Sequence, residues 1–441
     1  SKTRLDNGLE LIVVERPGLP LVNLSLLVKV GYADDPDTLP GQANFAMAML
    51  DEGTAGRDAL EISEQLSLLG AELNTSAGLD TSSVTLSALK DNLDESLQVF
   101  GDFVVNPTFS ASEMPRLRSE LLTNIQQEKT QPMGMALRVI PGILYGEDHP
   151  YAQPLTGSGN EASVKAITQQ GMESWHQRWF RPNNATLIVV GDTAAADMKG
   201  RIEQLFRNWR PGEIPQRAIV RVTPRVQDTI YLIDKSGAEQ SIILAGLLIT
   251  PMNNPREVAI EAMNDVLGGQ FSARINMNLR EQKSWSYGAR SMISATAAQR
   301  PWLIYAPVQM DKTAPALAEI HRELSEFLGE RPTSKEELVR VKRSNVLSLA
   351  GRWETNDKIL ADLTTLVAQG LDERYWNDYA AKLIDLSRED VISAAEATLK
   401  LDQITWVVVG DRARVEKELR ELGLGNIQLL DTEGNLLETT R

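Results

Sequence analysis

Cysteine is absent from this 441-residue sequence, and histidine occurs only three times, as His149, His176 and His321. Without cysteine the chain can form neither a disulfide nor a thiolate metal site, and it suits an oxidising or a reducing compartment equally well. No two of the histidines are close in sequence, so a local pair of histidine ligands is excluded. A metal site assembled from distant residues stays open.

Long apolar runs are also absent. The longest, residues 242–249, has the length of a buried strand and falls far short of the about 18 residues that a membrane-spanning helix needs. The net charge of −15 argues against nucleic acid, whose phosphates require a basic face, and against binding to anionic membranes. We attribute the acidity to a solvated surface, and an acidic chamber that favours basic peptides is the alternative.

An internal repeat is the main organising feature of the chain. Residues 184–192 end in Val-Val-Gly-Asp, and the same four residues end the segment 402–411, at an offset of 411 − 192 = 219. At this offset Pro36 falls on Pro255. The repeat predicts two homologous domains.

The length of the chain agrees with two domains, since 441 residues exceed one ordinary domain. Residues 209–225 contain three prolines among basic residues and have the composition of a connection. We therefore expect a first domain at 1–208, a linker at 209–225 and a second domain at 226–441.

Hydrophobic periodicity predicts the secondary structure of both halves. In the first half we expect strands at 9–15, 21–30, 84–88 and 184–192 and helices at 40–52, 57–69, 93–104, 112–129, 160–180 and 194–207. In the second half we expect strands at 228–234, 240–249, 286–293, 301–308 and 402–411 and helices at 255–267, 334–350 and 412–423. Thr333 and Glu336 form a predicted capping box before the helix 334–350. Each half has paired strands early, then a run of helices and one late strand. This order predicts an α+β fold rather than a doubly wound sheet, with a mostly antiparallel sheet packed with helices in each domain.

One predicted helix carries a motif whose chemistry has been lost. Residues 41–54 resemble the zinc helix of the pitrilysin or insulinase-like peptidases, which has H-x-x-E-H where this chain has Asn44-Phe45-Ala46-Met47-Ala48. In that motif two histidines four residues apart bind Zn²⁺, and the Glu is the general base. A neutral amide, a thioether and a methyl group cannot replace them. The segment also fits an amphipathic helix whose Ala and Met side chains fill a core, so the helix is expected to remain as scaffold.

The third zinc ligand of the family is a Glu eight residues before a Pro. Counting back from Pro132 places Asn124 at this position, another neutral amide. The resemblance therefore implies no metal site and no cofactor in this chain.

A second motif is kept. Arg280 and Tyr287 resemble the family's Arg and Tyr seven residues apart, within a match over residues 267–287. Arg offers a fork of donors and Tyr one neutral donor to a carbonyl or a developing oxyanion, and the family uses this pair to grip the substrate backbone. The alternative is a solvated Arg and an ordinary strand Tyr. A phosphate loop is an alternative for Gly268 and Gly269, but they follow a predicted helix and no Lys-Ser/Thr follows them, which favours a helix end.

The resemblance spans essentially the whole chain and is greatest to a small bacterial branch in which one chain carries the zinc motif and a sister chain the Arg/Tyr pair. It implies a non-catalytic subunit of a heterodimeric zinc endopeptidase, with Arg280 and Tyr287 as its catalytic contribution. The H-x-x-E-H sister subunit would supply zinc, base and water, and short or unfolded peptides would add as a strand to the sister's sheet edge. The alternative is a catalytically silent scaffold or peptide-binding protein. A hydrolase of another mechanism lacks support, because neither G-x-S-x-G nor a cysteine nucleophile is present.

The compartment follows only from the resemblance. The chain begins at Ser1 and enters the family pattern almost at once, so we expect that a leader has been removed. Bacterial relatives of this kind often carry a secretory leader, which favours the periplasm, with the cytoplasm as the alternative.

Overall fold

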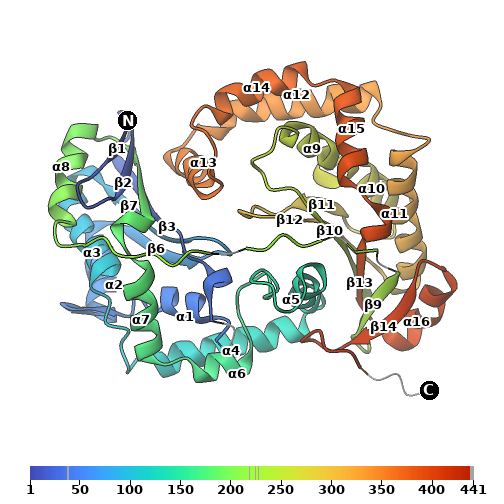
Figure 1. Cartoon of the computed structure of the whole chain (residues 1–441), viewed down its shortest axis with the longest axis horizontal. Helices are drawn as coiled ribbons and strands as arrows, with labels where there is room; N and C mark the ends of the chain where they lie inside the picture. Colours follow the sequence, from blue (N-terminus) through green and yellow to red (C-terminus); the bar gives the residue numbers. More distant parts are fainter. Residues whose placement is uncertain (37–38, 218, 224, 227, 438–441) are drawn as a thin grey trace. The chain divides into compact units, whose positions relative to one another are not determined.

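A computed structural model describes residues 1–36, 39–217, 219–223, 225–226 and 228–437 (Figure 1). The chain packs as two units. Unit 1 consists of Ser1–Ile125, Gly157–Ala218 and Ala350–Leu371, and unit 2 of Gln126–Thr156, Ile219–Leu349 and Asp372–Arg441. In the described part of the chain, no helix is both long and apolar enough to cross a membrane.

Unit 1 is built on a six-stranded sheet in the order β1-β2-β8-β3-β7-β6. The strands are β1 (Lys2–Arg4), β2 (Glu10–Glu15), β3 (Leu21–Val28), β6 (Glu72–Ala77), β7 (Ser82–Leu89) and β8 (Ala185–Gly191). Only β2 and β8 pair in parallel; the other neighbours are antiparallel. A separate small hairpin joins β4 (Gly53–Thr54) and β5 (Arg57–Asp58).

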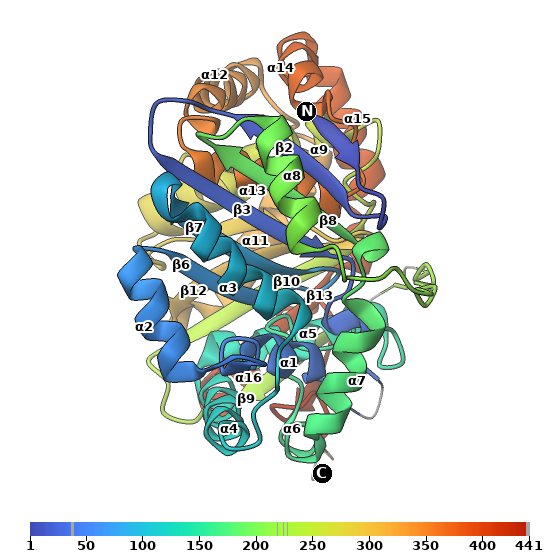
Figure 2. The ribbon, with the colours of Figure 1, turned by 90° about the vertical axis from the view of Figure 1, so that its left-hand side faces the viewer.

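Helices cover both faces of this sheet. One face buries Val13, Leu24 and Val189 in a core with side chains of α1, α3, α7 and α8, and α3 and α8 lie across the strands in Figure 2. The other face buries Ile188 and Val190 against Leu360 of α13. The helices of the unit are α1 (Gln42–Ala48), α2 (Ala59–Leu69), α3 (Leu93–Val105), α4 (Met114–Thr130), α6 (Glu161–Ala166), α7 (Gln169–Trp179), α8 (Ala195–Leu205) and α13 (Asn356–Ala368).

Unit 2 repeats this arrangement with the strand order β11-β12-β10-β13-β9-β14. Its strands are β9 (Thr229–Asp234), β10 (Gln240–Ile249), β11 (Arg290–Ile293), β12 (Arg300–Gln309), β13 (Thr405–Gly410) and β14 (Asn426–Leu430). Its helices are α5 (Pro132–Tyr145), α9 (Glu257–Asn264), α10 (Arg274–Asn276), α11 (Thr313–Leu328), α12 (Lys335–Arg352), α14 (Tyr375–Asp385), α15 (Arg388–Thr398) and α16 (Arg412–Glu421), with π-helical turns η4 (Asp265–Gly269) and η5 (Met277–Gln282).

The predicted repeat and the α+β fold are confirmed in three dimensions. The offset of 219 carries β2 onto β9, since 10 + 219 = 229 and 15 + 219 = 234, and it carries α7 onto α15 in the same way. Pairing agrees as well: β9 and β13 are parallel, as β2 and β8 are. The five strands common to the two sheets therefore occupy equivalent places.

The division of the chain differs from the expected boundaries at 1–208 and 226–441. Residues 126–156 pack in unit 2, and residues 350–371 pack in unit 1. Besides the last residues of α4 or α12, each exchanged segment holds one complete helix, α5 or α13. These two helices are repeat equivalents, because 132–145 shifted by 219 overlaps Asn356–Ala368. The physical reason is that each central sheet is apolar on both faces, and the exchanged helix buries the second face. Residues 218 and 224 of the expected linker lie outside the described residues.

Most predicted elements are present, and several differ from the prediction. The predicted helix 160–180 is two helices, because Thr168 accepts a hydrogen bond from Gly171 N and starts α7 anew. The capping box before α12 is Ser334 with Glu337, one residue later than expected. The predicted strand 286–293 begins only at Arg290. Helices α5, α11, α13, α14 and α15 were not predicted, and α5 holds a proline in its interior.

Candidate functional site

The helix that matches the zinc motif is kept as a short, well-anchored element of unit 1. Helix α1 covers Gln42–Ala48 rather than the predicted 40–52. At its start the carboxylate of Asp35 accepts hydrogen bonds from the backbone N–H groups of Gly41 (2.7 Å) and Ala43 (2.8 Å). At its end Thr75 of β6 donates its hydroxyl to the Met47 carbonyl at 2.7 Å. The helix is thus fixed between a loop and the edge strand.

The side chains at the ligand positions do not fit a zinc ion. Met47 is buried in the core, Asn44 and Ala48 are partly exposed, and Asn124 lies exposed on α4. None of these four offers an imidazole, thiolate or carboxylate, which are the donors that zinc prefers. Within the described residues, no three His, Cys, Asp or Glu side chains come together in a way that could hold a metal ion.

The histidines occupy three separate places. His176 is buried, its Nε2 lies 3.0 Å from the Val104 carbonyl, and burial lowers the pKa of its imidazole to about 4. His149 places Nε2 3.0 Å from the Val220 carbonyl. Each of these two rings has a backbone carbonyl as its partner.

Arg280 lies on the π-helical turn η5 of unit 2. Its guanidinium carbon lies 4.7 Å from the centre of the Phe271 ring, and its Nε is 3.4 Å from a carboxylate oxygen of Glu281. The side chain is 40% exposed, and Phe271 is 63% exposed. A guanidinium stacked on a ring keeps its N–H groups in the plane available to a ligand. Arg280 therefore stacks on Phe271 and remains accessible to a ligand.

Tyr287 lies in the irregular segment between η5 and β11, and not in the strand predicted for 286–293. It is 87% exposed. Within the described residues its hydroxyl has no hydrogen-bond partner. An aromatic side chain this exposed contributes little to a core, so the alternative of an ordinary strand tyrosine does not describe it.

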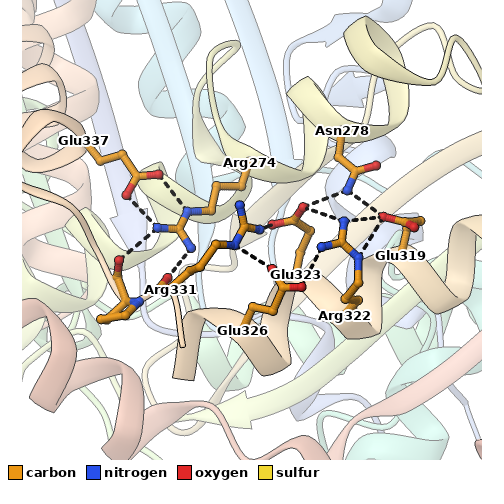
Figure 3. Close-up of polar contacts among 9 residues, drawn as sticks. Arg274, Asn278, Glu319, Arg322, Glu323, Glu326, Arg331 and Glu337 are labelled. Atoms are coloured by element: carbon orange, nitrogen blue, oxygen red, sulfur yellow. Dashed lines mark hydrogen bonds and ion pairs between the residues drawn. The ribbon is translucent and has the colours of Figure 1, made fainter. Parts of the chain in front are cut away.

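The segment before Arg280 is anchored by an ion-pair network that sequence inspection did not reveal (Figure 3). Arg274 donates Nε and an Nη to the two oxygens of Glu337 on α12, both at 2.7 Å. Its guanidinium also lies 5.0 Å from the centre of the Phe327 ring. Burial alone would raise the pKa of Glu337, but the bonds from Arg274 and the Ser334 N–H bring it below its ordinary value. This bidentate pair fixes the entry to η5.

Within η5 itself, Asn278 is tied to helix α11. Its Nδ2 donates to Glu319 at 2.8 Å and to Glu323 at 2.7 Å, and Figure 3 shows both carboxylates between Asn278 and the arginines below. Arg322 and Arg331 neutralise these carboxylates from the other side. The turn that carries Arg280 thus rests on a charged network rather than on apolar packing alone.

Comparison with known proteins identifies the family of this chain. Residues 11–157 match the family model described as Insulinase (Peptidase family M16), and residues 166–345 match the Peptidase M16 inactive domain. The chain belongs to peptidase family M16. The M16 chain is similar to the "uncharacterized zinc protease ML0855" of Mycobacterium leprae, with 23% identity over 339 residues, 76% of this chain and 75% of that protein.

Two solved structures share the M16 fold with this chain. A peptidase M16 inactive domain from Pseudomonas fluorescens is 25% identical, with a TM-score of 0.87 over 93% of this chain and 97% of that one. The periplasmic protease PqqL from Escherichia coli is 17% identical, with a TM-score of 0.75 over 96% of this chain and 50% of that one. This chain therefore corresponds in length to half of PqqL.

Proposed function

We propose that this M16 chain is the non-catalytic subunit of a heterodimeric zinc endopeptidase. It would present Arg280 and Tyr287 to a peptide bound at the zinc site of a sister subunit. That subunit would carry the H-x-x-E-H motif and supply the metal, the base and the water. The proposal deepens the family assignment, which by itself establishes only a peptidase fold.

One observation carries the proposal: Arg280 and Tyr287 are exposed, yet the segment between and around them is anchored. Tyr287 is 87% exposed, and Arg280 stacks on Phe271 while Asn278 and Arg274 fix the turn beneath it. Donors held in advance around a developing negative charge are worth about 3 kcal/mol each in comparable sites. A scaffold has no need of such an arrangement, whereas a subunit that stabilises a transition state does.

The substrate that this arrangement would suit is a peptide backbone. A guanidinium and a phenol hydroxyl are both donors, and they complement a carbonyl oxygen that becomes negative during attack. The resemblance further implies short or unfolded peptides that add as a strand to the sheet edge of the sister subunit. No nucleic acid and no membrane is part of the proposal.

We also propose the periplasm as the compartment, with the cytoplasm as the alternative. The similar PqqL structure is described as a periplasmic protease, and a chain without cysteine is compatible with an oxidising compartment. Fractionation of cells that express the natural gene decides between the two, since recovery with cytoplasmic markers would reject the periplasm.

The deciding experiment measures hydrolysis of a quenched fluorescent peptide by this chain, by a zinc-motif sister chain from the same genome, and by the mixture. We expect no activity from this chain alone and a rate from the mixture well above that of the sister chain. Arg280→Ala is expected to lower kcat/KM of the mixture by about 100-fold, with Tyr287→Phe also lowering it.

The matched control is Arg374→Ala, which removes another exposed guanidinium and is expected to leave the rate unchanged. Light scattering checks that each mixture still forms the complex. An intact complex whose rate does not respond to Arg280→Ala would favour the scaffold function instead. Activity from this chain alone would refute the proposal.

A further inference from the structure

Asn276 joins the two segments that carry the proposed substrate-facing side chains. It is 4% exposed and lies in α10, directly before η5. Its Nδ2 donates to the carbonyl oxygen of Phe271 at 2.7 Å, and its Oδ1 accepts from the backbone N–H of Ala289 at 3.1 Å. One buried amide therefore connects a residue before the turn with a residue after it.

One connection leads to Phe271 and the other to the segment that carries Tyr287. Phe271 is the ring on which Arg280 stacks. Ala289 follows Tyr287 by two residues, and the segment between them contains only one local bond, from Gly288 N to the Ser286 hydroxyl at 3.0 Å. Neither segment belongs to a strand or to a regular helix. Asn276 bonds to both segments and so links them directly through one side chain.

The chemistry of asparagine suits this place. A carbonyl must face the NH₂ group and an N–H must face the Oδ1, so the two partners fix the orientation of the amide. A hydrophobic side chain would leave both backbone groups unpaired, and a carboxylate could serve only Ala289. Asparagine satisfies both partners at once.

We propose that Asn276 is a positioning residue that sets Tyr287 relative to the Arg280–Phe271 stack. This inference rests on the proposed function, because it assigns Asn276 a role in the same reaction without contact with the substrate. The competing explanation is a buried asparagine that contributes to stability alone. The two explanations differ in what a change at Asn276 does to turnover.

Two variants separate the two bonds. Asn276→Ala removes both, and Asn276→Asp keeps an acceptor for the Ala289 N–H while it loses the donor to Phe271. In the complex with the sister chain, Asn276→Ala is expected to lower kcat by about 10- to 100-fold, the scale of a misplacement near 1 Å, with a smaller change in KM. Asn276→Asp is expected to lie between Asn276→Ala and the unchanged chain.

Hydrogen exchange gives a readout that does not need the sister chain. The amide of Ala289 is expected to exchange faster in Asn276→Ala and to stay protected in Asn276→Asp, because only the first variant removes its acceptor. A double variant tests whether Asn276 acts on kcat through Tyr287. If Asn276 acts through Tyr287, adding Asn276→Ala to Tyr287→Phe is expected to cause little further loss of kcat.

Asn184→Ala is the matched control for stability. Asn184 is also buried, and its Nδ2 donates to the carbonyls of Lys29 and Trp179 in unit 1, far in sequence from Arg280. If Asn276→Ala lowers kcat no more than Asn184→Ala does, the positioning role is refuted and the proposed function is not. Absence of any rate gain when the unchanged chain meets the sister chain would overturn the proposed function, and this role with it. Full additivity with Tyr287→Phe would also overturn the role.

Discussion

Replacing Glu261 with glutamine is expected to stabilise unit 2 at neutral and alkaline pH and to change its stability little in acid. Glu257, Glu261 and Asp265 follow one another at intervals of four residues along α9 and into η4, so their carboxylates share one helix face. Glu257 is paired with the buried Arg300. Asp265 accepts from the amide of Asn345 at 2.7 Å. Within the described part of the chain, Glu261 has the hydroxyl of Tyr379 as its one hydrogen-bond donor.

The magnitude follows from the environment of that carboxyl. Burial, and next the charge of Glu257, raise the pKa of Glu261 to about 7 from its ordinary 4.5, although the Tyr379 hydroxyl bond opposes the rise. The folded state therefore binds the proton more tightly than the unfolded state does. The stability that the protonated Glu261 contributes is fully present below about pH 4.5 and is lost as the pH rises through about 7. At about 1.4 kcal/mol per pH unit, the loss amounts to about 3 kcal/mol.

Glutamine cannot ionise and keeps a carbonyl acceptor for the Tyr379 hydroxyl, so Glu261→Gln avoids this loss. We expect the variant to exceed the unchanged chain by about 3 kcal/mol in free energy of unfolding near pH 8 and by less than about 1 kcal/mol near pH 5. Urea unfolding at the two pH values, followed by tryptophan fluorescence, measures the difference.

The control for the change in net charge is Glu418→Gln, at an exposed position of α16 in the same unit. If Glu261→Gln shifts stability by the same amount at both pH values, the carboxyl is not the group that titrates and the reasoning fails. If Glu261→Gln is less stable than the unchanged chain near pH 8, neighbouring groups stabilise the charged carboxylate of Glu261 and the reasoning also fails.

Three further predictions concern buried groups and the lost metal site. Arg300→Met leaves the Glu257 carboxylate buried without its cation, and it is expected to lower the free energy of unfolding, measured in urea, by about 3–5 kcal/mol. Adding Glu257→Gln is expected to recover much of this loss, and full stability of the single variant would contradict the prediction. Burial lowers the pKa of His176 to about 4 from 6.5, so the free energy of unfolding is expected to decrease by about 3 kcal/mol as the pH falls through this range. His176→Phe is expected to reduce this pH dependence, and an unchanged dependence of stability on pH would refute the prediction. Because the ligand positions carry no zinc donors, dialysis against a chelator is expected to leave the Tm unchanged in calorimetry, and a lower Tm would reveal a metal site assembled elsewhere.

Local patterns in the sequence predicted much of the fold. Alternating and apolar runs located β10 at Gln240–Ile249 and β13 at Thr405–Gly410 to within a few residues, because the period of side-chain burial is a property of the segment itself. The repeat offset likewise predicted that the two sheets match. Helix α5 was not predicted. Proline is typical of helix breaks, yet Pro132 occupies the first turn, where its missing N–H costs nothing, and Pro141 lies inside the helix.

The candidate site was only partly predictable. The positions of Arg280 and Tyr287 came from the motif, but their exposure and the stack on Phe271 depend on how η5 rests on α11 and α12. The bond from Ala289 to Asn276 joins residues 13 apart through a side chain. No local period or cap signals such a bond, so sequence inspection could not find it.

By itself the sequence determined which chemistry this chain has lost. Asn44, Met47, Ala48 and Asn124 lack the basic nitrogen, thiolate or carboxylate that holds zinc, and no fold can restore an atom that the side chains do not contain. Only the tertiary structure decided which helix covers which sheet, which carboxyl on α9 is left without a cation, and which donors reach the surface. These properties depend on packing between residues far apart in the chain, where burial and neighbouring charge, rather than residue type, set the energies.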